Sequence, residues 1–207
     1  MRHLLSFALV IASPVWAQED EDFDPALVSL TDAINCHIDA PTYNGFALNV
    51  SGEDGVAAQL GWTKVESDNP FLLEYELPEP IAVTGHWATR RVVFSSTAVL
   101  AILDEPDPNV VAMPEGIVNE MDPQPLIDEL VATGRTTREE VESEIRFRKF
   151  LGQRVLADVT EPAETPDGFG THTVIARSVS NVTSHPGKTL YGCSYRIELL
   201  DAAGKPM

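Results

Sequence analysis

The sequence predicts an α+β domain: an antiparallel β-sheet of about six to seven strands with two to four helices packed on one face. Two stretches, 71–103 and 147–200, are rich in β-branched and aromatic residues and are divided by short turns, which is typical of antiparallel strands. Before and between them, apolar residues recur at helical spacing behind capping residues. A chain of 207 residues falls within the range of a single compact unit, so we expect one domain.

The composition indicates a folded, acidic protein. Hydrophobic residues make up 43% of the chain, which is enough for a core rather than disorder. The 32 Asp and Glu residues outnumber the 14 Lys and Arg residues, and the formal net charge is −18. Because affinity for nucleic acids depends on cations that neutralise phosphates, we expect no nucleic-acid partner. The simplest role of the acidity is solubility.

The first 17 residues have the organisation of an export signal. Basic residues precede an apolar run from Leu4 to Ala12, and small residues follow at the positions that a signal peptidase reads. The run is too short to span a bilayer, which needs about 20 apolar residues. We therefore expect cleavage after Ala17, an acidic flexible leader over 18–24 and one domain over 25–207, outside the cytoplasm and without a transmembrane anchor.

The domain begins with a predicted helix. Asp24 is a good N-cap, Pro25 suits the first helical position, and apolar residues recur at helical spacing as far as Ile38. Cys36 lies in this helix, and the second of the two cysteines, Cys193, lies in the last predicted strand. An even pair in an oxidising compartment indicates a disulfide. The bridge would tie the first helix to the last strand and leave no thiol for cysteine-dependent catalysis.

A short strand and a second helix are predicted next. Apolar and small or polar residues alternate over 45–51, a pattern that favours a half-buried strand. Ser51 and Asp54 have the spacing of a capping box, which predicts a short helix that ends at Gly61.

From residue 70 the pattern changes to strands. β-Branched and aromatic residues predict strands over 71–77, 81–87 and 89–103, with a turn at the Pro-Glu-Pro sequence 78–80. The proline-rich segment 104–119 predicts an irregular surface loop.

Two helices and a meander complete the predicted chain. Asp122 and Pro123 cap one helix, with Gly134 just past its end, and Thr137 with Glu140 repeats the capping signature for another. Three strands joined by turns containing Pro and Gly follow, over 147–159, 171–182 and 189–200.

No catalytic, cofactor-binding or metal-binding residues are predicted. The strong motifs of hydrolases, metalloproteases and nucleotide-binding proteins do not occur in the sequence. The histidines of the domain are interpreted as surface or edge residues, with His172 and His185 toward opposite ends of one strand. Acidic loops at 104–109 and 161–167 carry oxygen ligands and carboxylates, but they lack the spacing of a calcium loop and are interpreted as solvated.

Positive charge is concentrated in one segment of this acidic chain. Arg146, Arg148 and Lys149 precede or begin a predicted strand, where their alternation would leave Phe147 inward. One interpretation is a patch that binds an anion or a partner. The alternative is that these cations neutralise the neighbouring glutamates and complement a helix C-terminus.

These observations favour an exported acidic domain that binds a protein or small-molecule partner, or that accompanies the cell envelope, without catalysing a reaction. A secreted hydrolase with acidic catalytic residues is the first alternative, and a purely structural envelope component is the second. A concave pocket with converging polar groups would favour the hydrolase, whereas a flat exposed apolar patch would favour partner binding.

Overall fold

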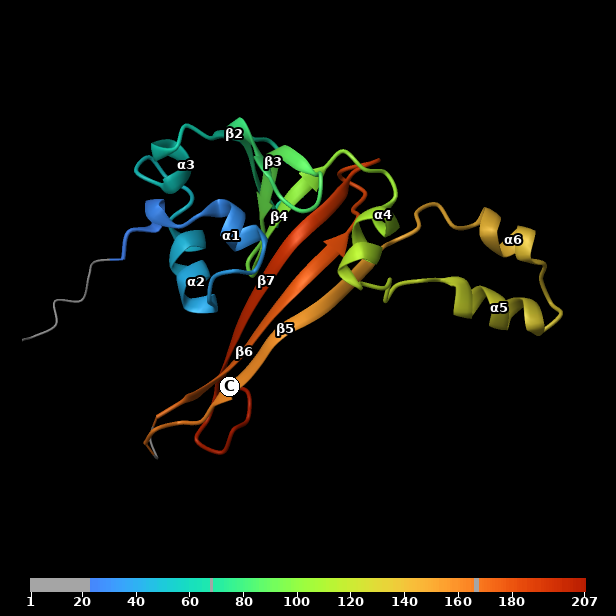
Figure 1. Cartoon of the computed structure of the whole chain (residues 1–207). Coiled ribbons are helices and arrows are strands. Elements are labelled where there is room, and N and C mark those ends of the chain that lie inside the picture. The colour runs from blue at the N-terminus through green and yellow to red at the C-terminus, as the bar shows by residue number, and fades with distance from the viewer. Residues whose placement is uncertain (1–22, 68, 166–167) are drawn as a thin grey trace, which may run out of the picture.

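The structure is a computed structural model that describes residues 23–67, 69–165 and 168–207. The predicted export signal and residues 18–22 of the predicted leader lie outside the described residues. Seven strands form one sheet in the order β1-β2-β3-β4-β7-β6-β5, and every neighbouring pair is antiparallel (Figure 1). The predicted α+β class, with about six to seven antiparallel strands, is therefore confirmed.

Two meanders make up the sheet. The first consists of β1 (Thr63–Val65), β2 (Leu73–Ala82), β3 (Ala88–Phe94) and β4 (Ala98–Leu103). The second, predicted from the sequence, consists of β5 (Leu151–Glu161), β6 (Gly170–Ser180) and β7 (Thr189–Leu200). The two meanders join where β4 pairs with β7, with Leu103 opposite Thr189. The last strand of the chain therefore lies inside the sheet, between β4 and β6.

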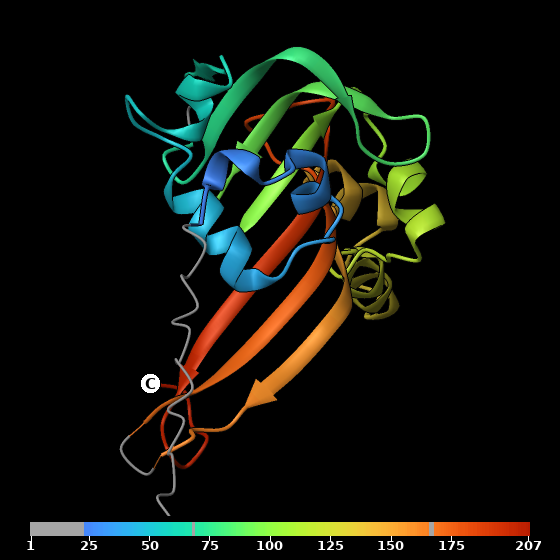
Figure 2. The same cartoon turned by 60° about the vertical axis from the view of Figure 1, so that its left-hand side comes forward.

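Helices cover one face of the sheet (Figures 1 and 2). α1 (Leu30–Ile34) and α2 (Ala40–Leu48) lie on β7, and α4 (Pro108–Ala112) contacts β6 and β7. Tyr43 of α2 stacks on Tyr195 of β7, with ring centroids 4.3 Å apart. Around this stack lies the main core, which includes Ile34, Phe46, Phe94, Val99, Val111, Val179 and Tyr191.

The opposite face carries a smaller apolar cluster. Val93, Ile102 and Leu190 form it, and the partly buried Val182 of the β6–β7 loop packs against it. This loop therefore crosses the reverse face of the sheet rather than lying free in solvent. The short helices η1 (Pro25–Leu27), α3 (Val56–Gln59) and η2 (Met113–Glu115) complete the connections.

α5 (Gln124–Ala132) and α6 (Arg138–Ser143) form a hairpin that projects from the sheet (Figure 1). The predicted capping box at Thr137 and Glu140 is confirmed at the start of α6. Gly134 follows α5 with a φ of 69°, as expected of a residue that ends a helix. None of the helices in the described ranges is long and apolar enough to cross a membrane.

The strand predicted over 45–51 is wrong, because residues 45–48 are the end of α2 and residues 49–51 follow it without forming a strand. The Asp39 carboxylate accepts a hydrogen bond from the Thr42 amide at 2.7 Å and starts the helix. Tyr43 and Phe46 are three residues apart and fully buried, whereas Leu48 is 84% exposed. The buried residues thus follow the helical period, and the apparent alternation through Leu48 was accidental.

The first helix is shorter than predicted. Asp24 does act as an N-cap, with its carboxylate accepting from the Ala26 amide, but only for the single turn η1. Ser29 caps α1 separately, and α1 ends at Ile34, so Cys36 lies beyond it with a φ of 60°. The predicted capping box at Ser51 is also wrong, because Gly55 occupies the N-cap of α3 without a side-chain hydrogen bond.

Other boundaries also differ from the prediction. The predicted strand 81–87 is the end of β2 followed by a loop, and the predicted strand 89–103 is divided into β3 and β4. The Pro-Glu-Pro sequence 78–80 does not form a turn but lies inside β2, where the register with β3 shifts between Glu76 and Ile81. A bulge on a strand tolerates proline because the local ladder is already interrupted. The segment 104–119 is not wholly irregular, since it contains α4 and η2. The strand predicted from 147 begins at Leu151.

The second meander runs past the layer of helices (Figures 1 and 2). We refer to its distal part as the arm, consisting of residues 157–161 of β5, 171–175 of β6 and 195–200 of β7, which are paired in register. β5 forms the outer edge of the sheet on this side.

Candidate functional site

The predicted basic segment lies between α6 and β5. Because β5 begins at Leu151, the alternation expected for Arg146, Arg148 and Lys149 does not exist, and Phe147 is 40% exposed rather than inward. The backbone amide of Leu151 donates to the Asn119 side chain at 3.0 Å, so this part of the chain is anchored by a loop.

The three cations have different surroundings. Arg148 lies 3.9 Å from the carboxylate of Glu142, and the Lys149 ammonium donates to the carbonyl oxygen of Asn181. Burial lowers the pKa of Lys149. Arg148 and Lys149 line a hollow of about 420 Å³ whose lining includes acidic and amide side chains, but not Arg146. The structure thus brings two of the three predicted residues together, and both have partners within the protein.

The histidines do not converge. His172 lies on β6 and His185 in the β6–β7 loop, toward opposite ends of the strand as expected. The interpretation of His185 as a surface residue is wrong, because its side chain is 9% exposed and its Nε2 lies 2.9 Å from a carboxylate oxygen of Glu74. In the described part of the chain, no three His, Cys, Asp or Glu side chains are placed to hold a metal ion.

Glu74 of β2 forms a buried polar cluster that no local pattern in the sequence indicates. Its side chain is 2% exposed, and it accepts a hydrogen bond from Nε of Arg91 at 2.6 Å as well as contacting His185. The hydroxyl of Ser184 lies 3.0 Å from Nδ1 of His185. A hollow of about 270 Å³ adjoins the cluster, and Lys188 is part of its lining.

The series Ser184, His185 and Glu74 has the order of groups found in hydrolase triads. Two observations favour a structural role instead. Arg91 already neutralises Glu74, and the cluster fastens the β6–β7 loop to β2 across the reverse face. His185 is 111 residues from Glu74 in the sequence, so no local pattern could have shown this contact.

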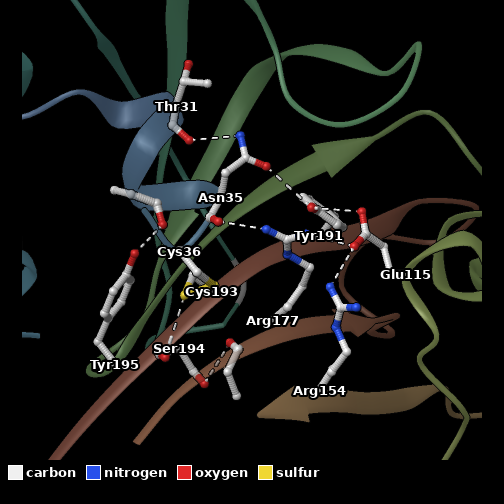
Figure 3. The surroundings of a disulfide bond; sticks show 12 residues. Thr31, Asn35, Cys36, Glu115, Arg154, Arg177, Tyr191, Cys193, Ser194 and Tyr195 are labelled. Atoms are coloured by element: carbon white, nitrogen blue, oxygen red, sulfur yellow. Dashed lines mark hydrogen bonds and ion pairs between the residues drawn. A yellow bond between two sulfur atoms is a disulfide. The ribbon is translucent and has the colours of Figure 1, made fainter. Parts of the chain in front are cut away.

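A second polar network surrounds the disulfide (Figure 3). Cys36 and Cys193 are bonded as predicted, with a Cα separation of 5.3 Å. Arg177 of β6 donates to the Glu115 carboxylate at 2.7 Å and to the Asn35 carbonyl at 2.7 Å. Arg154 of β5 also approaches Glu115, at 3.4 Å. The network therefore connects the segment before the disulfide with η2 and two strands.

The network keeps Glu115 ionised. Burial raises the pKa of Glu115, but hydrogen bonds from Arg177, Thr84 and Tyr191 outweigh this effect, and the pKa lies below its ordinary value of 4.5. Two arginines thus neutralise one mostly buried carboxylate, which is the arrangement expected of a structural ion pair.

The two acidic loops lie at opposite ends of the second meander. Asp104 follows Leu103, which pairs with the first residue of β7, whereas Glu161 aligns through β6 with Leu199 near the end of β7. Ten residues of strand separate these ends, about 33 Å. Carboxylates of the two loops therefore do not form a pair, and Asp167 lies outside the described residues.

The arm presents an exposed apolar strip on the same face as the helices. Val159 is 50% exposed and Leu199 is 46% exposed, and the partly buried Ile175 and Ile197 lie between them and the core. The pairing of β5, β6 and β7 places these four side chains on one face, because residues two apart along a strand point the same way. The arm thus exposes apolar side chains on this face, with the polar Thr173 of β6 between Val159 and Ile197.

On the reverse face of the arm, His172 lies between two carboxylates. Its Nε2 is 2.9 Å from Asp158 of β5, and its Nδ1 is 3.6 Å from Glu198 of β7. The hydrogen bond with Asp158, aided by Glu198, raises the pKa of His172.

Comparisons with known proteins give no relative. No protein-family model, no curated protein and no solved structure matches the chain.

Proposed function

We propose that the protein is an exported, non-catalytic domain that binds another protein through its arm. The observation that carries the proposal is the apolar strip on the arm, formed by the half-exposed Val159 and Leu199 together with Ile175 and Ile197, which are partly buried against the core. Apolar side chains that lie together on a flat exposed surface are typical of protein interaction sites.

Two further observations support this function. The disulfide between Cys36 and Cys193 is what an oxidising compartment outside the cytoplasm favours. The polar groups that do converge, around Glu74 and around Glu115, neutralise one another and hold segments of the fold together. They support structural roles rather than chemistry on a substrate.

The experiment is a selection of peptides from a random displayed library against the mature domain. Selected peptides are then measured against Val159→Asp and against Val118→Asp. Val118 is 75% exposed in a loop outside the arm, so the second variant is a matched control. We expect binding to be lost in Val159→Asp and retained in Val118→Asp, with both melting temperatures near that of the parent. A selection that yields no binder, or binders indifferent to Val159, would refute the proposal.

A further inference from the structure

We infer that the segment bound by the arm is a basic, extended strand that pairs with Ala157–Glu161 of β5 and adds an eighth strand to the sheet. This inference rests on the proposed function and names the partner's chemistry and its mode of binding.

The edge of β5 is open where it forms part of the arm. Leu151, at the start of the strand, accepts a backbone hydrogen bond from Glu120 and donates to Asn119, so this end is covered. From 152 to 161, the only backbone hydrogen bonds to described residues are those of the ladder with β6. An open edge of this kind is a template for a strand from another chain.

The register identifies the outward-facing groups. In antiparallel pairs, residues whose N–H and C=O groups point to the partner alternate with residues whose groups point away. The backbone N–H and C=O groups of Leu151, which is opposite Ser180, point away from β6. The β5 residues opposite every second residue of β6, counted from Ser180, therefore also direct their backbone groups outward. In the arm these are Asp158, opposite Val174, and Thr160, opposite His172.

A bulge limits the length of the site. The register shifts between Val155 and Ala157, so Leu156 is an extra residue that interrupts the edge. Regular pairing resumes for five residues, Ala157 to Glu161, and this is the segment available to a partner strand.

The charge of the edge selects the partner. From Val155 to Thr165 the chain contains three carboxylates, on Asp158, Glu161 and Glu164, and no Lys or Arg. Opposite charges across a strand pair are stabilising and like charges are destabilising. A second copy of β5 would place carboxylates against carboxylates, and the whole chain has a net charge of −18. The complementary occupant is therefore a basic segment from a different protein.

The two faces of the sheet further define that segment. Val159 points to the helix-bearing face, next to the apolar strip, whereas Asp158 points to the reverse face. An added strand would alternate in the same way. Its apolar side chains would extend the strip beside Val159, and its Lys or Arg side chains would lie beside Asp158.

The test uses defined peptides with blocked ends, measured by fluorescence anisotropy against the mature protein at low salt. The probe is a heptapeptide of alternating Lys and Val. One comparison peptide replaces Lys with Glu, and another carries N-methyl groups that remove the amide donors of one edge. We expect the Lys peptide to bind and the other two to bind at least about tenfold more weakly, with affinity falling as salt rises.

Matched charge reversals locate the site. The variant Asp158→Lys should weaken binding by about tenfold, whereas Glu53→Lys, with the same change in net charge at an exposed residue far along the chain, should leave it nearly unchanged. Thr160→Pro, which removes an outward amide, should abolish binding. If Thr160→Pro does not fold, the N-methyl peptide tests the same backbone contact.

Four outcomes would overturn the inference. Equal weakening by both charge reversals would show general attraction to an acidic protein rather than binding at β5. Unchanged binding of the N-methyl peptide would exclude strand addition. Peptides that are selected from the library and bind through Val159 without basic residues would refute the basic partner while leaving the proposed function intact, whereas the absence of any arm-dependent binder would refute both.

Discussion

Arg177 and Cys193 lie directly opposite each other on β6 and β7. The guanidinium that neutralises Glu115 is therefore held one strand away from the disulfide, and the same guanidinium donates to Asn35, the residue before Cys36 (Figure 3). The covalent link and the ion pair thus fasten the same segment to the sheet. This relationship makes both of them candidates for sites on which the stability of the fold depends.

Loss of the disulfide should destabilise the protein strongly. Cys36→Ser removes a bridge between residues 157 positions apart, and losing a native disulfide usually costs about 2 to 5 kcal/mol. Urea unfolding under non-reducing conditions measures the difference. Mass spectrometry of unreduced peptides should find the peptide containing Cys36 linked to the one containing Cys193, and free thiols in the native protein would contradict the bridge.

Glu115→Gln should lower stability and reduce the sensitivity of stability to acid. The change leaves Arg177, whose side chain is 14% exposed, without its charged partner, at a cost of about 3 kcal/mol. Because the folded-state pKa of Glu115 lies below its ordinary value of 4.5, its ionised form stabilises the fold above that value. The contribution is lost as the pH falls through the folded-state pKa.

Urea unfolding of both proteins from about pH 7 down to about pH 3 measures this difference, since the protons bound on unfolding set the slope of stability against pH. The difference in the free energy of unfolding between the parent and Glu115→Gln should become smaller toward low pH. A difference that stays constant across this range would show that Glu115 does not change its ionisation on unfolding.

Arg91→Met should lower the free energy of unfolding more than Glu74→Gln does. Arg91 is 42% exposed and can turn toward water when Glu74 is neutral, whereas Glu74 is 2% exposed and cannot reach water when Arg91 is removed. We expect a loss of about 3 kcal/mol for Arg91→Met and about 1 kcal/mol for Glu74→Gln. Thermal or urea unfolding tests the order, and the reverse order would mean that His185 alone compensates the buried carboxylate.

Charge reversal should change the melting temperature differently at Lys149 and at Arg146 of the basic segment. Lys149→Glu removes the hydrogen bond to Asn181 and places a carboxylate at a partly buried position, so we expect a clear fall in melting temperature. Arg146→Glu changes an exposed side chain and should leave the melting temperature nearly unchanged. An equal fall in both would show that the segment acts as one structural unit, and an interaction lost in Arg146→Glu alone would support a binding patch.

The first 17 residues predict export. Material recovered from outside the cytoplasm should begin with Gln18-Glu19-Asp20, because the apolar run and the small residues before Gln18 direct cleavage after Ala17. N-terminal sequencing of that material is the measurement. Retention of Met1 in the recovered protein would contradict the prediction.

Local patterns predicted the parts of the fold that depend on neighbouring residues. The last three strands followed from β-branched runs separated by turn residues, and the capping box of Thr137 and Glu140 followed from a contact three residues apart. The pairing of the disulfide could be predicted without any geometry, because two cysteines allow only one pairing. The errors also have local causes: the spacing of Phe46, Leu48 and Val50 fits a strand as well as a helix until burial distinguishes them.

The sequence by itself determined the α+β class, the C-terminal meander, the acidity and the pairing of Cys36 with Cys193, since composition and short-range periodicity are sufficient for each. Only the tertiary structure decided that β4 pairs with β7, that His185 reaches Glu74, and that β5 is the open edge of a projecting arm. Strand order and long-range ion pairs depend on which surfaces meet when the core forms. Residues more than 80 positions apart meet there, and no periodicity along the chain records such a contact.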